Sequence, residues 1–181
     1  AVGDSGAFPR VTRASVIVGT HETPYLRLGR GAPALYLAPN TERETTSAWD
    51  VATALAAGRR VTLLEPPSTA PNALPHAAHA THSASLPALG PAFATWLTGL
   101  LDGLGIARAA IIAAEVYALR VLHFALAHGD RVERVVLLTD DAPDSTLPLI
   151  GAVGTTPAVP VLILPSLAAT SHSPDESPVH S

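Results

Sequence analysis

The chain has 181 residues, 48% of them hydrophobic, and this length and composition predict one domain with a single sizeable core. Only 14% of the residues are charged, the formal net charge is −4, and the arginines are scattered along the sequence. This balance argues against nucleic acid or an anionic membrane surface as partner, because both call for a basic patch. Cysteine is absent, which excludes a disulfide framework, a thiolate metal site and a cysteine nucleophile.

Targeting signals are not evident in the sequence. The first ten residues, AVGDSGAFPR, contain no basic region followed by an apolar run, so they do not have the pattern of a secretory signal. No apolar stretch reaches the ~18 residues that would suggest a membrane span. We therefore expect a soluble protein with a cytoplasmic location.

The first half of the chain alternates short apolar runs with turn residues. A turn is expected at His21–Pro24, between the first two strands. Ser47 is a candidate cap for a helix over 48–57, and Gly58 would end that helix. Four apolar runs predict strands: 16–20, 25–28, 34–37 and 61–64.

The second half begins with a segment of different composition. Residues 66–91 are rich in Pro, Ala, Ser and His and predict a long surface loop or lid. The last residues, 166–181, are polar and are expected to form a loose tail. Between these segments the apolar pattern predicts helices and strands in alternation: a helix over 92–104, a strand over 109–113, a helix over 116–128, and strands over 132–138 and 161–164.

Short apolar strands alternating with helices predict a single α/β domain over 1–181, with a mostly parallel sheet and helices on both faces. In such sheets ligands bind at the carboxyl ends of the strands. We therefore expect a functional site where polar residues follow the predicted strands: Asn40, Glu65, Glu115, Asp140 or Asp141, and Ser166.

These elements, in this order, resemble the α/β-hydrolase fold over most of the chain. The stretches that carry the resemblance are APALYLAPN, WDVATALAAGRRVTLLEPP, FATWLTGLLDGLGIARAAIIAAEVYALRVLHFALAHGDRVERVVLL and TPAVPVLIL. The resemblance implies a truncated form of that fold, without the cap and without the last strand and helix. It also implies that residues 111–138 contain the strand, sharp turn and helix that present the nucleophile in that family.

The catalytic motifs of that family are altered in this sequence. The nucleophile motif G-x-S-x-G is replaced by Ala113-Ala114-Glu115-Val116-Tyr117, so Glu115 stands where the family has Ser, Asp or Cys. The family needs small residues beside the nucleophile because the turn passes close to its neighbours. Tyr117 is not small, so the turn must open or the ring must point into the site. Without a serine at this position, serine-hydrolase activity is not expected.

The supporting parts of the triad also differ. After the third strand the family has His-Gly, and this sequence has Ala38-Pro39, of which Pro39 has no N–H to offer an oxyanion. The amides of Asn40 and Val116 remain as a possible pair of donors. For the acid, the resemblance offers Asp140 or Asp141 after the sixth strand. For the histidine it offers His172, in the sequence SHSPDESP.

General acid–base chemistry is one hypothesis for Glu115. A carboxylate in a mostly apolar pocket, near Val116, Ile112 and Leu37, suits proton transfer on a small apolar molecule. Such an enzyme would be a cyclase, isomerase or lyase, for example in natural-product biosynthesis. The residues expected to take part fall into two groups: catalytic Glu115, Tyr117, Asp140 and His172, and substrate-binding Ala38, Asn40, Glu65 and Val116.

Two other hypotheses stay open. The domain could be a catalytically inactive pseudo-hydrolase that binds a ligand or a protein, with Glu115 stabilising the start of the following helix. It could also be a hydrolase with a carboxylate nucleophile, as in the haloalkane dehalogenases and epoxide hydrolases of this fold. A closed apolar pocket around Glu115 favours catalysis or ligand binding, whereas a core filled by Tyr117 favours the inactive form.

The sequence also bears on metal binding and on the oligomeric state. His76, His79 and His82 are spaced by three residues, but no acidic residue adjoins them, so an exposed polar loop explains them better than a metal site. We expect no cofactor and no metal. The apolar run at 160–164 would leave an open sheet edge, which predicts a homodimer.

Overall fold

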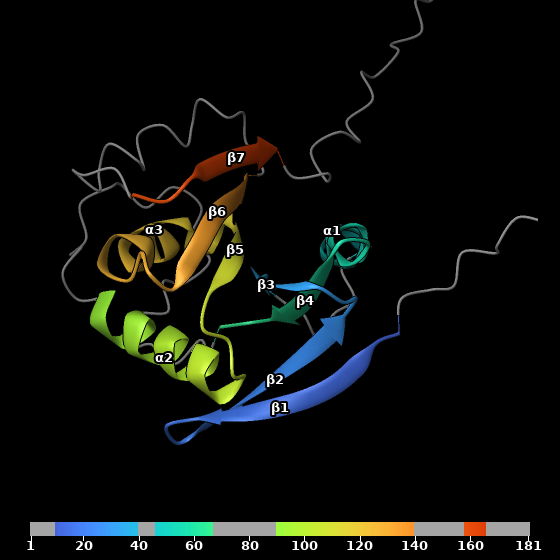
Figure 1. The fold of residues 1–181 in the computed structure, drawn as a ribbon, viewed down its shortest axis with the longest axis horizontal. Helices are drawn as coiled ribbons and strands as arrows, with labels where there is room; N and C mark the ends of the chain where they lie inside the picture. The colour runs from blue at the N-terminus through green and yellow to red at the C-terminus, as the bar shows by residue number, and fades with distance from the viewer. Residues whose placement is uncertain (1–9, 40–45, 67–89, 140–157, 166–181) are drawn as a thin grey trace, which may run out of the picture.

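A seven-stranded sheet runs through the residues that the computed structural model describes, which are 10–39, 46–66, 90–139 and 158–165 (Figure 1). The helices and strands, with their bounds, follow one another along the chain in this order: β1 (Thr12–Val18), β2 (His21–Leu28), β3 (Ala32–Leu37), α1 (Thr46–Ala56), β4 (Arg59–Leu64), α2 (Gly90–Gly103), β5 (Ala109–Ala114), the 3₁₀-helix η1 (Glu115–Tyr117), α3 (Ala118–Ala127), β6 (Val132–Thr139) and β7 (Val161–Pro165).

The strands lie in the order β1-β2-β4-β3-β5-β6-β7. The pairs β1–β2 and β2–β4 are antiparallel, and every other neighbouring pair is parallel. The predicted fold class, a mostly parallel α/β sheet, is confirmed. Because the sheet is parallel from β4 to β7, the carboxyl ends of these strands share one edge, and their amino ends share the opposite edge.

Helices cover both faces of the sheet, as expected from strands that are apolar on both sides. Successive residues of a strand point to opposite faces. On one face, Leu35 and Leu37 of β3 belong to a core cluster with residues of α2 and α3, and on the other, Ala34 and Tyr36 belong to a cluster with α1. In Figure 1 α1 accordingly lies on the opposite side of the sheet from α2 and α3.

The first hairpin differs from the prediction. Its turn lies at Gly19–Thr20, where Gly19 adopts a φ of 62°, and the expected turn at His21–Pro24 is the first half of β2. Pro24 suggested a turn, but it lies before the part of β2 that pairs with β4, which begins at Tyr25. Only one edge of β2 is paired there, with β1, so a residue without an N–H is tolerated within the strand.

Three helix boundaries also needed correction. Ser47 is the second residue of α1 and not its cap, because the helix begins at Thr46. Helix α2 begins at Gly90, so the end of the predicted 66–91 loop is helical. Helix α3 begins at Ala118 instead of 116, because a 3₁₀ turn comes between β5 and the helix. The remaining predicted strands are present within two residues of their expected ends.

Candidate functional site

Glu115 lies at the bend between the central strand β5 and helix α3, as the sequence predicts. Ala114 ends the strand in an extended conformation (φ −63°, ψ 154°), and Glu115 opens the 3₁₀ turn, with its carbonyl accepting the Ala118 N–H. The bend therefore contains one 3₁₀ turn, which lies between β5 and α3.

Glu65 and Glu115 lie at the same edge of the sheet. In the strand register, Leu37 of β3 is opposite Leu64 of β4 on one side and Ala113 of β5 on the other. The two glutamates follow those strands within two residues, on either side of the end of β3. Neighbouring strands are about 4.8 Å apart, so the ends of β4 and β5 are separated by about 10 Å. The prediction that acidic residues gather at this edge holds for these two.

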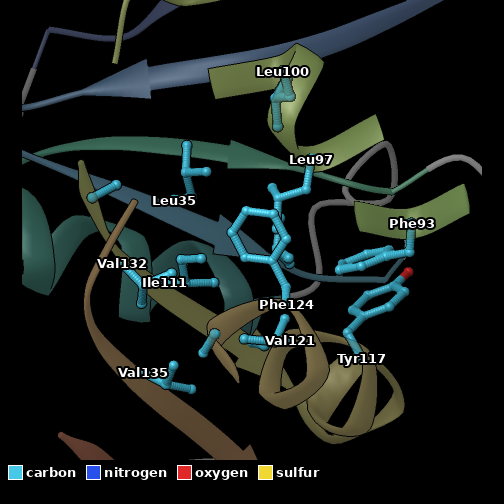
Figure 2. Close-up of a cluster of buried hydrophobic side chains, with 14 of the residues drawn as sticks. Leu35, Phe93, Leu97, Leu100, Ile111, Tyr117, Val121, Phe124, Val132 and Val135 are labelled. Carbon is cyan, nitrogen blue, oxygen red and sulfur yellow. The ribbon is translucent and has the colours of Figure 1, made fainter. Parts of the chain in front are cut away.

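Tyr117 is buried, with 8% of its surface exposed, in the core cluster that includes Phe93 and Trp96 of α2. Figure 2 shows its ring directed toward Phe93. Burial raises the pKa of the Tyr117 hydroxyl to about 12; the negative charge of Glu65 raises it further, and the positive charge of Arg120 opposes the shift. At neutral pH the phenol therefore stays protonated, and a group with this pKa is poorly matched to proton transfer.

The main-chain donors after β3 are also changed. The Ala38 N–H donates to the Leu64 carbonyl at 3.1 Å, and Ala38 itself is 1% exposed. Pro39 has no N–H. Neither residue can therefore donate a hydrogen bond to an oxyanion from this position. Asn40, the next candidate donor, lies outside the described residues.

The three apolar residues expected around Glu115 differ in their positions. Val116 is 65% exposed, and so it points away from the core. Ile112 belongs to the cluster on the α1 face, whereas Leu37 and Tyr117 belong to the cluster on the α2 and α3 face, because side chains alternate along a strand. An apolar lining of Glu115 by all three residues stays a prediction.

Arg120 was not singled out from the sequence. It follows Tyr117 by three residues, about one helical turn, and its charge acts on the Tyr117 hydroxyl. Helical spacing after the bend was the signal that could have identified it. The described part of this edge thus combines two carboxylates, one guanidinium and one buried phenol.

Other predicted site residues lie outside the described residues. They are Asn40, Asp140, Asp141, Ser166, His172 and the three histidines His76, His79 and His82, together with most of the 66–91 segment and the 166–181 tail. Within the described ranges, no group of three His, Cys, Asp or Glu residues is placed to hold a metal ion. None of the helices described is long and apolar enough to cross a membrane.

Comparison with solved structures identifies the fold. The chain superposes on naproxen esterase from Bacillus subtilis (TM-score 0.54, 17% identity, covering 74% of this chain and 45% of the esterase). It also superposes on the Bacillus subtilis carboxylesterase CesB (TM-score 0.53, 19% identity, 76% and 48% covered) and on a Vigna radiata epoxide hydrolase (TM-score 0.52, 17% identity, 74% and 40% covered). No protein-family model and no curated protein matches the sequence.

This protein has the α/β-hydrolase fold, as the sequence motifs led us to expect. The chain spans less than half the length of these three solved structures. Identities below 20% establish the fold and do not carry over the activity of any of these enzymes.

Proposed function

We propose that this domain is a catalytically inactive pseudo-hydrolase that acts as a ligand- or protein-binding module. The observation that carries the proposal is the position of Tyr117. Its ring fills the core next to the bend, at the position where a hydrolase needs a small residue. A filled core leaves Glu115 as a recognition group at the surface of this edge.

The main chain after β3 supports this proposal. The Ala38 N–H is bonded to Leu64 within the sheet and Pro39 has no N–H, so the two residues that stand in place of His-Gly offer no donor to an oxyanion. Stabilisation of an oxyanion requires donors that are oriented in advance toward the developing charge, and losing one such donor costs an enzyme about 10²–10³ in kcat.

The experiment compares the wild type with two variants, using p-nitrophenyl butyrate as substrate and a fluorophosphonate probe for covalent labelling. We expect no turnover and no labelling for the wild type, and also none for Glu115→Ser, because Tyr117 still fills the core beside the bend. Circular dichroism controls for folding. Turnover by the wild type that disappears in Glu115→Gln would overturn the proposal.

A second candidate is a non-hydrolytic enzyme that uses Glu115 in acid–base chemistry, as a cyclase, isomerase or lyase acting on a small apolar molecule. It is favoured by the partial exposure of Glu115 at the edge that also holds Glu65. The two carboxylates give this edge a base and a second charged group, at the ends of β4 and β5 on either side of β3. A catalytic role for Asp140 and His172, which the sequence analysis named beside Glu115, remains a proposal.

An activated benzisoxazole tests the second candidate without knowledge of the natural substrate. A base removes its ring C–H proton, the N–O bond breaks, and a cyanophenolate is released, which is followed by its absorbance. If Glu115 is a catalytic base, Glu115→Gln should lower the rate by about 10²-fold or more. Equal rates for the wild type and Glu115→Gln would exclude that role.

A hydrolase with a carboxylate nucleophile is the third hypothesis, and an epoxide hydrolase is among the similar structures. The extra methylene of glutamate argues against it, since reacting groups must be held within about 0.5 Å. Single-turnover hydrolysis of styrene oxide in ¹⁸O-water would transfer label into Glu115 if the carboxylate formed an ester. We expect an unlabelled protein.

The predicted homodimer remains a proposal, as does the cytoplasmic location. Strand β7 ends the described sheet, and its Leu162 and Leu164 are 53% and 40% exposed. An open apolar edge of this kind can pair with a second copy of the chain. Light scattering should give a dimer that dissociates in Leu162→Glu. A monomeric mass for the wild type at high concentration would contradict the proposal.

A further inference from the structure

The hairpin of β1 and β2 is closely packed on one of its two faces. Val18 lies against Gly99 of α2, where an added Cβ would be 2.8 Å from its Cγ1. Val16 lies against Gly103 in the same way. On the other face, Ile17 is 73% exposed, and helix α1 packs mainly on β4. The α1 face of the hairpin is therefore largely open to solvent.

A hollow of about 430 Å³ lies on this open face. The strand register puts Arg13 of β1 opposite Leu26 of β2, and Leu26 opposite Leu63 of β4. Ser15 and Pro24 form another pair, two residues further along the hairpin. Leu63 belongs to the core cluster on the α1 face, and Leu26 packs against that cluster. All five side chains therefore point to the α1 face, and all five residues line the hollow.

The hollow is level with the carboxyl end of β4. Its lining also includes Ala14 and Tyr25, and Tyr25 is opposite Leu64, the last residue of β4. Tyr25 packs against the cluster of α2 and α3, and Ala14 is its register partner, so both side chains point to the other face. These two residues therefore border the hollow with main-chain atoms. The carboxyl ends of the strands are where α/β sheets bind ligands.

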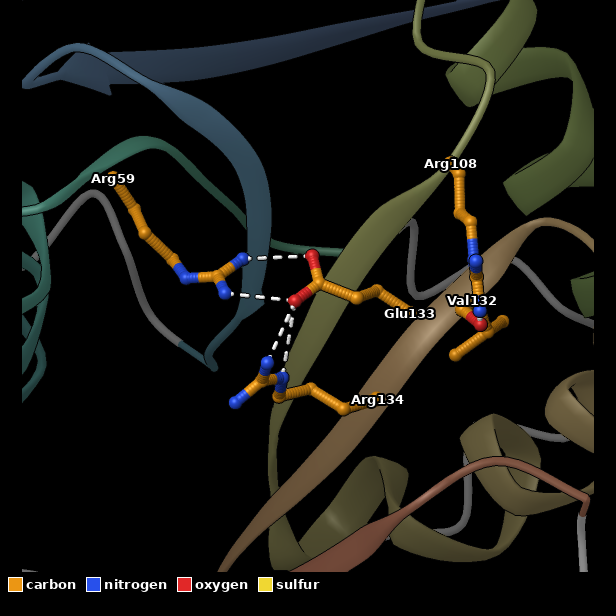
Figure 3. Close-up of polar contacts among 5 residues, drawn as sticks. All are labelled: Arg59, Arg108, Val132, Glu133 and Arg134. Atoms are coloured by element: carbon orange, nitrogen blue, oxygen red, sulfur yellow. Dashed lines mark hydrogen bonds and ion pairs between the residues drawn. The ribbon is translucent and has the colours of Figure 1, made fainter.

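Arg13 differs from two other arginines on the α1 face. Arg59 and Arg134 both bind Glu133, and Arg59 donates two hydrogen bonds of 2.8 and 3.0 Å (Figure 3). Within the described residues, the side chains of Arg13 and Ser15 have neither a hydrogen bond nor an ion pair. Their Cα positions are about 7 Å apart along β1. A guanidinium and a hydroxyl are thus both available to donate to one added anion.

Polar and apolar groups occupy opposite sides of the hollow. Arg13 and Ser15 are on β1, whereas Leu63 is on β4, two strands away in the sheet. With strands about 4.8 Å apart, this distance is about 10 Å. Pro24 and Leu26 lie between them on β2. The volume of about 430 Å³ falls in the range of about 300–1,000 Å³ that is usual for small-molecule sites.

The charges around the hollow favour a single carboxylate. Among the described residues that line it, Arg13 is the only charged one. A guanidinium binds a carboxylate through two parallel hydrogen bonds, so one arginine is sufficient for this group. Glu22 points to the same face, but its Cα is about 14 Å along β2 from Leu26, the register partner of Arg13. An anionic head group is therefore favoured beside Arg13 and disfavoured toward the tip of the hairpin.

We propose that this hollow binds a small monocarboxylic acid with an apolar body about 10 Å long. The carboxylate pairs with Arg13 and accepts a hydrogen bond from the Ser15 hydroxyl, and the apolar body lies on the proline and the two leucines of β2 and β4. Strand β2 is three strands from β5 in the sheet, about 14 Å, so this site is separate from Glu115. The inference goes beyond the proposed pseudo-hydrolase function and does not depend on it.

The test is an NMR titration of the ¹⁵N-labelled full chain with three probes. Octanoate has an extended chain of about 10 Å at about 1.5 Å per carbon–carbon bond, and it should bind with a Kd of about 1 mM or lower. Octanamide has the same length without the charge and should bind about tenfold more weakly. Butyrate keeps the charge but lacks most of the apolar body, and it should also bind at least about tenfold more weakly. The amide shifts that octanoate changes should be those of the residues that line the hollow.

Two variants and a matched control locate the site. Arg13→Gln should weaken octanoate binding about tenfold or more, and Ser15→Phe, which fills the hollow, should abolish it. Both side chains are exposed, so the melting temperature should stay the same. Arg60→Gln is the control, because Arg60 is exposed on the other face of β4, and it should bind octanoate like the wild type. Equal binding by the wild type and Arg13→Gln, equal binding of octanamide and octanoate, or no shift change with octanoate would overturn the proposal.

Discussion

The two ends of the sheet differ in what their polar residues do. At the amino-terminal end, arginines pair with Glu133 and Asp102 in contacts of 2.8–3.0 Å. At the carboxyl end, where parallel sheets bind ligands, Glu115 opens a 3₁₀ turn and Tyr117 fills the core beside it. The comparison shows that polar contacts hold the fold together at one end of the sheet, whereas at the other end an aromatic ring fills the core beside the bend.

The largest loss of stability is expected from a substitution at Gly29, which tests how tightly the amino-terminal end of the sheet is packed. Its φ is 71°, and a Cβ at this position would overlap the carbonyls of Arg59 and Ala56 and lie 2.9 Å from Ala56 Cα. Gly29→Ala adds backbone strain to this steric conflict with main-chain atoms, and we expect a loss of about 4 kcal/mol. Thermal denaturation should show a melting temperature lower by about 10 °C.

Gly19, in the hairpin at the other end, is the matched control. It has a similar φ of 62°, but nothing lies within 4 Å of a Cβ built there. Gly19→Ala should cost only the backbone strain, about 1 kcal/mol. If Gly29→Ala and Gly19→Ala lowered the free energy of unfolding by the same amount, the close contact of Gly29 with α1 and β4 would not be the cause of the loss.

Tyr117 gives the corresponding test at the carboxyl end. Removing the ring in Tyr117→Ala leaves a cavity beside Phe93 and Trp96, and we expect a loss of about 3 kcal/mol in chemical denaturation. Addition of p-cresol, which has the shape of the missing side chain, should restore part of the melting temperature of this variant.

Tyr117→Phe is the control for the ring, since it keeps the ring and removes only the hydroxyl. We expect it to change stability by about 1 kcal/mol or less. A mild effect of Tyr117→Ala, with no response to p-cresol, would mean that the ring does not fill the core. The pseudo-hydrolase proposal would then lose its main support.

The smallest of the three losses of stability is expected at Glu133, and this loss depends on pH. Hydrogen bonds from Arg59 are the main cause that lowers the pKa of the Glu133 carboxyl from 4.5 to about 2. Because the folded-state pKa is the lower one, this stabilisation is present above about pH 5 and is lost as the pH falls from 4.5 toward 2. After allowance for solvent screening at a partly exposed pair, we expect about 1 kcal/mol.

Glu133→Gln should therefore be less stable than the wild type at pH 7, and urea denaturation of the two proteins should converge as the pH approaches 2. Asp102→Asn provides the comparison, because the Asp102 side chain is 63% exposed and that of Glu133 is 30% exposed. The Asp102 variant should lose less stability. A constant difference between the wild type and Glu133→Gln from pH 7 to pH 2 would contradict the assignment.

Much of the fold could be predicted because its signals are local. Apolar runs such as Val61–Leu64 and Ala109–Ala113 formed the expected strands, and Gly58 and Gly105 followed the expected helices. The errors arose where tertiary contacts overrode a local preference. Pro24 looked like a turn residue, but it is accommodated in β2 because one edge of the strand is unpaired there.

The candidate site was predicted in part. The position of Glu115 followed from the strand, turn and helix pattern, which is contiguous in the sequence. The surroundings of that residue did not follow, because they depend on which face each side chain occupies. Ile112 and Tyr117, five residues apart, belong to clusters on opposite faces of the sheet.

The sequence by itself determined the order of helices and strands, the carboxylate at the bend and the absence of a serine or cysteine nucleophile, since each depends on neighbouring residues. Only the tertiary structure decided that Tyr117 is buried, that the Ala38 N–H is bonded to Leu64, and that Arg59 pairs with Glu133. The physical reason is that strand order and register join residues far apart in the chain, and no local pattern specifies which strands become neighbours.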